Sequence, residues 1–164
     1  IIKHASIKDA AMFKTLEDNT LSSYQKKKKQ TCELIQRNAL IKTKVVQQDE
    51  FEKGDRKMLN FGHTLGHALE NQYELTHGEA ISIGMAYAAS LSQTITGFKQ
   101  TDRVVSLLDK YHLPTFAEFN KDKVIEVLSK DKKKIKDNIQ FILLERIGKA
   151  VIKPVTIKQI YQTL

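Results

Sequence analysis

A run of small residues after His77 restricts the fold of this chain more than any other feature of its sequence. The run has helical spacing and no proline, and its small members are Ala80, Gly84, Ala86, Ala88, Ala89 and Ser90. Small side chains let neighbouring backbones approach closely, so a helix built from them can be packed on several sides. We therefore predict a central, buried helix that starts near His77.

Helical patterns also dominate the rest of the chain, which contains only two prolines. From apolar spacing and capping residues, further helices are expected within 1–17, 22–46, 56–73, 101–112 (capped by Thr101 and Asp102) and 120–129 (capped by Asn120), and after a cap at Thr156. The polar segment 48–55 contains a glycine and is expected to be a loop.

Two runs rich in β-formers, 139–144 and 150–155, flank the segment 145–149 and predict a hairpin. The length of 164 residues suits one domain with its own core. The predicted fold of residues 1–164 is therefore mainly α, a multi-helix bundle with one small β-hairpin near the C-terminus.

Composition excludes several classes of protein. No apolar run approaches the roughly 18 residues that span a bilayer, and the first residues lack the apolar segment of a secretory signal. Cys32 is the only cysteine, which rules out an internal disulfide and a cysteine-based zinc site and fits a reducing cytoplasm.

The formal net charge of +8 suits an anionic partner: nucleic acid, an acidic membrane surface or a small anionic substrate. The lysine run 26–29 is most simply the solvated side of a helix. Aromatic residues are few and none alternates with this run, so base stacking has little support. A basic helical module that binds nucleic acid is kept as a distant alternative, and no membrane partner is expected.

Histidines and glycines cluster in the middle of the chain. His63 and His67 are spaced i, i+4, which allows two imidazoles on one helix face to share a metal. His77 could reach the same point if its helix lies antiparallel to theirs, although such a pair is often structural or exposed. Gly62 and Gly66 are also four apart and predict close approach by another backbone or by a ligand.

A polar stripe precedes the histidines. Arg56 and Asn60 lie at helical spacing from His63 and His67, so the four would share one face of the predicted helix over 56–73. Arginine pairs well with phosphate or carboxylate, and asparagine binds hydroxyl groups. The stripe indicates an anionic, hydroxylated ligand, with a merely solvated face as the competing interpretation.

These motifs carry a resemblance to a known family. The segment 42–70, which includes Gly-Asp-Arg-Lys-Met-Leu-Asn-Phe-Gly-His-Thr-Leu-Gly-His-Ala-Leu-Glu over 54–70, and the following His77-Gly78-Glu79-Ala80 resemble the signature of 3-dehydroquinate synthases. The start of the chain, 131–133 and 141–144 also match, so the resemblance covers nearly the whole chain.

The resemblance implies a lyase of the shikimate pathway, which leads to aromatic amino acids. Such an enzyme converts 3-deoxy-D-arabino-heptulosonate 7-phosphate to 3-dehydroquinate and phosphate. It uses NAD and a divalent metal, usually zinc, with cobalt as another possibility. It is commonly a cytoplasmic homodimer, in which an N-terminal domain binds NAD and a helical C-terminal domain binds metal and substrate.

The resemblance also implies roles for individual residues. His63 and His77 match the metal-binding histidines, and a third ligand, a glutamate, is expected directly before Ile1. His67 then becomes a proton-handling catalytic residue and not a ligand, since an imidazole exchanges protons near neutral pH. The positions that match the remaining substrate-contacting residues are Glu52, which is assigned with His67 to catalysis, and Lys3, Lys42, Arg56, Asn60 and one of Lys132 and Lys133.

The chain starts with Ile1, and no Gly-x-Gly-x-x-Gly motif follows a predicted strand. It is therefore expected to be a piece of a longer protein that lacks the NAD-binding domain, to be inactive alone and to bind metal weakly. A related sugar-phosphate cyclase, such as a 2-deoxy-scyllo-inosose synthase, or a metal-dependent polyol dehydrogenase is the alternative within the same superfamily.

Overall fold

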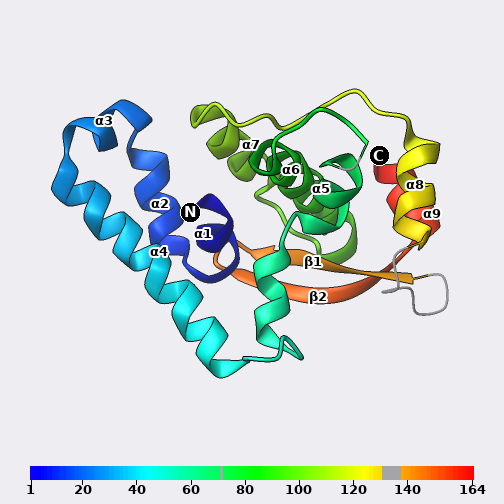
Figure 1. Ribbon diagram of the computed structural model, residues 1–164, viewed down its shortest axis with the longest axis horizontal. Helices are drawn as coiled ribbons and strands as arrows, with labels where there is room; N and C mark the ends of the chain where they lie inside the picture. Colours follow the sequence, from blue (N-terminus) through cyan, green and yellow to red (C-terminus); the bar gives the residue numbers. More distant parts are fainter. Residues whose placement is uncertain (71, 131–137) are drawn as a thin grey trace.

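A computed structural model describes residues 1–70, 72–130 and 138–164. Its helices are α1 (Ile2–Lys8), α2 (Ala10–Asp18), α3 (Leu21–Lys26), α4 (Lys28–Gln48), the 3-10 helix η1 (Asp55–Asn60), α5 (His63–Glu70), α6 (His77–Thr96), α7 (Thr101–Lys110), α8 (Lys121–Lys130) and α9 (Ile157–Thr163). Strands β1 (Asn138–Arg146) and β2 (Lys149–Thr156) pair antiparallel. The predicted mainly α fold with a hairpin near the C-terminus is confirmed (Figure 1).

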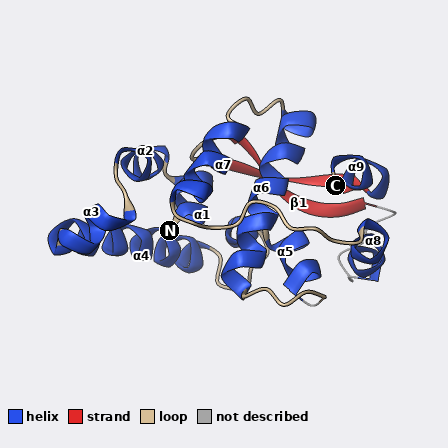
Figure 2. Ribbon diagram, turned by 90° about the horizontal axis from the view of Figure 1, so that it is seen from above, coloured by secondary structure: helices blue, strands red, loops and turns tan. Residues whose placement is uncertain are grey.

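Helix α6 lies between two hydrophobic cores. Ile81 and Met85 belong to a core that includes α1, α2 and α7, whereas Ile83 and Tyr87 belong to a second core with α5, α8 and α9. Strand β1 contributes to both cores because its successive side chains point to opposite faces. Figure 2 shows α6 in the middle of the molecule, next to the hairpin. The prediction of a central, buried helix is confirmed.

Glycines allow the backbones of the segment 62–66 and of α6 to pack in direct contact. A Cβ atom added to Gly84 would lie 2.0 Å from the carbonyl oxygen of Gly62, and one added to Gly66 would lie 3.0 Å from that of Ala80. The distance at Gly84 is too short for any side chain, and the one at Gly66 is tighter than side chains normally make, so the predicted close approach of another backbone is confirmed. The crossing fixes where α5 and the start of α6 meet.

The helix predicted over 56–73 is wrong as a single element. Gly62 has a φ of +82°, which an α-helix cannot contain, and it separates η1 from α5. The chain turns here so that the Gly62 carbonyl can pack against Gly84. Arg56 and Asn60 therefore lie on a different element from His63 and His67, and the predicted single stripe does not exist.

The other predicted helices are present with shifted boundaries. The segment 1–17 is divided at Asp9, whose carboxylate caps α2, and 22–46 is divided at Lys27. The predicted caps at Asn120 and Thr156 are confirmed. Thr101 is not a cap: it lies inside α7 and donates to the Ala89 carbonyl. Among the helices of the described ranges, none combines the length and apolarity required to cross a bilayer.

Candidate metal and anion site

Three imidazoles converge where α5 meets the start of α6. The ring centroids of His63 and His67 are 5.2 Å apart, those of His63 and His77 are 5.7 Å apart, and those of His67 and His77 are 6.1 Å apart. The glycine crossing of the two helices produces this convergence. The structure thus brings His63 and His77 together, as the metal hypothesis requires, while their assignment as ligands stays a prediction.

The surroundings of His63 fix its protonation and its orientation. Its Nδ1 atom lies 3.3 Å from the carbonyl oxygen of Phe61, which can only accept, so Nδ1 donates and Nε2 keeps a lone pair. Burial, together with the nearby charge of Lys3, lowers the pKa of His63 to about 4. The ring is therefore neutral at neutral pH, the form that binds metals.

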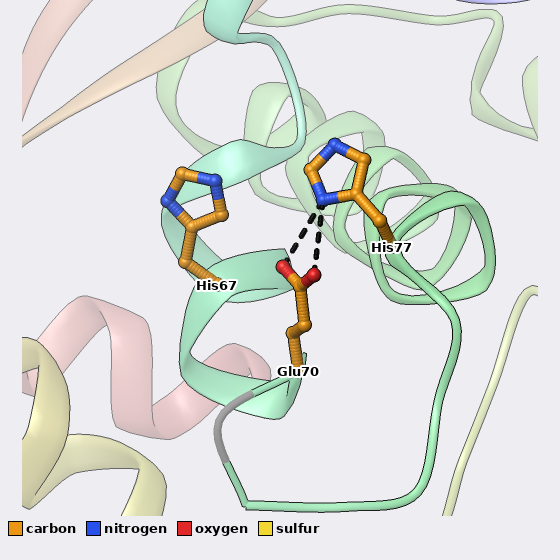
Figure 3. Close-up of side chains that lie close together, drawn as sticks. All are labelled: His67, Glu70 and His77. Atoms are coloured by element: carbon orange, nitrogen blue, oxygen red, sulfur yellow. Dashed lines mark hydrogen bonds and ion pairs between the residues drawn. The ribbon is translucent and has the colours of Figure 1, made fainter.

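Glu70 joins the histidines and was missed by sequence reasoning. Ligand atoms of His67, Glu70 and His77 all lie within 4.8 Å of one another. Figure 3 shows these three side chains at the end of α5 and the start of α6. The i, i+3 spacing of His67 and Glu70 could have indicated in the sequence that the two side chains lie close together on one helix. His77 belongs both to this set and to the predicted pair with His63.

The predicted substrate residues of the described ranges line one cavity of about 430 Å³. They come from four segments, α1, α4, the loop after α4, and η1, and they are Lys3, Lys42, Glu52, Arg56 and Asn60. Packing, not one helix face, gathers them. Lys132 and Lys133 lie outside the described residues.

The loop before η1 is ordered by one carboxylate. Asp49 accepts hydrogen bonds from the backbone N–H groups of Lys53, Gly54 and Arg56 at 2.9, 2.7 and 3.0 Å, and these bonds lower its pKa. Within the loop, Glu52 adopts a φ of 54° and accepts a hydrogen bond of 2.6 Å from the Asn60 amide. The carboxylate of the loop and the amide of η1 therefore lie side by side, a pair suited to hydroxyl groups.

Lys3 connects the cavity to the histidines. It also lines a neighbouring, largely apolar cavity of about 530 Å³ together with His63 and His77. Burial, with repulsion from Lys42, lowers the pKa of Lys3 to about 8. Three cationic side chains, Lys3, Lys42 and Arg56, thus face a cavity with one carboxylate, Glu52, which favours an anionic ligand.

Solved structures with this fold are known. A 2-epi-5-epi-valiolone synthase from Streptomyces hygroscopicus, with NAD+ and Zn2+ bound, is 26% identical and superposes over 99% of this chain and 47% of its own, with a TM-score of 0.84. A 2-deoxy-scyllo-inosose synthase complexed with carbaglucose-6-phosphate, NAD+ and Co2+ is 28% identical over 99% of this chain and 48% of its own, with a TM-score of 0.81. The fold places this chain among the helical domains of dehydroquinate synthase-like synthases.

Sequence comparisons define the family more closely. The family model described as 3-dehydroquinate synthase C-terminal matches residues 1–134. The 3-dehydroquinate synthase of Dehalococcoides mccartyi is 40% identical over 93% of this chain and 44% of its own length, and that of Thermoanaerobacter pseudethanolicus is 36% identical over 100% and 48%. The chain belongs to the 3-dehydroquinate synthase family, and it spans about half the length of these relatives.

Proposed function

We propose that this chain is the metal- and substrate-binding part of a 3-dehydroquinate synthase, which converts 3-deoxy-D-arabino-heptulosonate 7-phosphate to 3-dehydroquinate and phosphate. The observation that carries the proposal is the cavity in which Lys3, Lys42 and Arg56 gather beside the imidazole cluster. These cations bind the carboxylate and the phosphate of the substrate, while Glu52 and Asn60 bind hydroxyl groups. Correct placement of these groups supplies much of the catalysis.

The imidazole cluster fits a divalent metal such as zinc or cobalt. His63 and His77 hold it in the proposal, since His63 is neutral and keeps a free Nε2. When bound, the metal acts as a Lewis acid that acidifies the hydroxyl groups of the substrate. His67 exchanges protons with the substrate. NAD, which carries the hydride chemistry, is bound by the rest of a longer enzyme that we propose to be a homodimer.

The test compares phosphate release by the complete enzyme that contains this chain with phosphate release by its Arg56→Gln variant. We expect a loss of at least about tenfold in kcat/KM, because a charged, paired hydrogen bond to substrate is lost. Arg146→Gln, which removes an exposed arginine of the hairpin, is the matched control and should behave like the wild type. Equal activity of the two variants would contradict the proposal that this cavity binds the substrate.

A related sugar-phosphate cyclase is the second candidate, because the fold also matches a 2-deoxy-scyllo-inosose synthase at a TM-score of 0.81. Carbaglucose-6-phosphate, which that synthase binds, is the carbocyclic analogue of glucose 6-phosphate. The two candidate functions therefore differ in substrate, which is a seven-carbon keto-acid phosphate in one and a hexose phosphate such as glucose 6-phosphate in the other. The same enzyme assayed with each substrate separates them. Turnover of glucose 6-phosphate alone would favour the second candidate.

A further inference from the structure

Glu70 and His77 hold the two ends of one loop together. Glu70 is the last residue of α5 and His77 is the first of α6. The Nδ1 atom of His77 lies 3.1 and 3.2 Å from the two carboxylate oxygens of Glu70. Figure 3 shows the carboxylate facing this one nitrogen of the ring, while the other nitrogen points away from it.

This contact determines which nitrogen of His77 carries the proton. An ionised carboxylate can only accept hydrogen bonds, so Nδ1 must be the donor, and Nε2 of the neutral ring is left with its lone pair. We propose that Glu70 is a positioning residue that holds His77 in the Nδ1–H form and thereby offers Nε2 to the metal. The inference rests on the proposed function, because that function includes the metal.

The same arrangement occurs at the other proposed ligand. The Phe61 carbonyl accepts from Nδ1 of His63, just as the Glu70 carboxylate accepts from Nδ1 of His77. In each of these two imidazoles, whose centroids are 5.7 Å apart, Nδ1 therefore has its own hydrogen-bond acceptor and Nε2 has none of these contacts. Outer partners of this kind orient metal-binding histidines. Glu70 thus acts through His77 and is not itself a ligand.

The contact is exposed enough to be removed without loss of the fold. The side chains of His77 and Glu70 are 59% and 34% exposed, and ion pairs at such sites contribute little to stability. Glu70→Ala removes the acceptor, and Glu70→Gln keeps an accepting oxygen without the charge. Glu74→Ala, an exposed glutamate of the same loop, is the matched control.

The first experiment measures the tautomer of His77 in the metal-free chain by 15N NMR, at a pH where the ring is neutral. We expect Nδ1–H in the wild type, in Glu70→Gln and in Glu74→Ala, and a shift toward Nε2–H in Glu70→Ala. An Nε2–H ring in the wild type, or the same tautomer in wild type and Glu70→Ala, overturns the inference.

The second experiment measures zinc affinity by calorimetry. Glu70→Ala should bind about 10–100-fold more weakly, Glu70→Gln should recover most of the affinity, and Glu74→Ala should match the wild type. If Glu70→Gln binds zinc as weakly as Glu70→Ala, Glu70 is a ligand and the inference is wrong. Absence of zinc binding by the longer enzyme that contains the wild-type chain contradicts the proposed function, whereas the NMR result still decides the role of Glu70.

Discussion

Two buried or half-buried basic residues near the start of the chain, Lys3 and His4, have acid–base properties that differ from those of exposed groups. The pKa of Lys3 is lowered to about 8 and that of His4 to about 4, in both cases chiefly because burial penalises the charged form. Both side chains line the cavity of about 430 Å³, and the Nδ1–H group of His4 donates a hydrogen bond of 2.8 Å to the Asn38 amide oxygen. Each therefore predicts a different pH dependence.

For Lys3 we expect anion binding to weaken as pH rises through about 8, because the ammonium becomes a neutral amine. Sulfate is the probe, since its own charge is constant over this range, and calorimetry at pH 7 and pH 9 measures its affinity. Loss of one charged hydrogen bond predicts a decrease of about fivefold. Lys3→Met should abolish this step, and the exposed control Lys57→Met should retain it. A step that survives in Lys3→Met would assign it to another group.

For His4 the prediction concerns stability. Its folded pKa of about 4 lies below the ordinary value of 6.5, so below pH 6.5 the unfolded chain binds a proton that the folded chain does not. The contribution of neutral His4 to the free energy of unfolding is therefore fully present above pH 6.5 and is lost as the pH falls toward 4. Urea unfolding of His4→Gln should show a loss between pH 7 and pH 4 that is about 2–3 kcal/mol smaller than in the wild type. Equal losses of stability in His4→Gln and in the wild type would contradict the lowered pKa of His4.

At the scale of elements, the crossing of α5 and α6 places the imidazoles. Gly84→Ala would push a methyl group into the Gly62 backbone, and backbone cannot move aside as a flexible side chain can. We expect a loss of about 3 kcal/mol or more in the free energy of unfolding, measured with urea. Zinc binding should weaken as well, because the three rings no longer converge.

The matched control is Gly78→Ala, in the first turn of the same helix. An added Cβ atom there meets nothing within 4 Å, and alanine forms helix better than glycine. We expect this variant to be unchanged or more stable by up to about 1 kcal/mol. Similar losses in both variants would show that the crossing distance is not the cause.

At the scale of the whole molecule, the described residues supply cations and imidazoles, while the matching relatives are about twice as long. We expect the 164 residues alone to bind the sugar phosphate without releasing phosphate. We also expect weaker zinc binding than in the complete enzyme, because the resemblance implies a third ligand directly before Ile1. Phosphate release by the 164-residue chain, or zinc affinity equal to that of the complete enzyme, would contradict this division of roles.

Much of the fold could be predicted from the sequence because it depends on local patterns. The small residues after His77 allow α6 to be surrounded, and the β-rich runs on either side of 145–149 form the hairpin. Asn120 and Thr156 cap their helices through bonds to residues three positions away. Periodicity and capping report on neighbours within a few residues, so the sequence displays them directly.

The candidate site was only partly visible in the sequence. The spacing of His63, His67 and His77 indicated an imidazole cluster, but Lys3 and Lys42 were found by resemblance, because they lie on separate helices. Glu70 was missed, since its contact with His77 depends on how the intervening loop closes.

The sequence by itself determined the kinds of elements, the central position of α6 and the residue types available for metal and anion binding. Only the tertiary structure decided that the chain breaks at Gly62, that four segments share one cavity and that Glu70 faces Nδ1 of His77. The physical reason is the range of the forces. Helix and strand preferences act between near neighbours, whereas the positive φ of Gly62 and the meeting of Lys3 with Lys42 result from packing between distant segments.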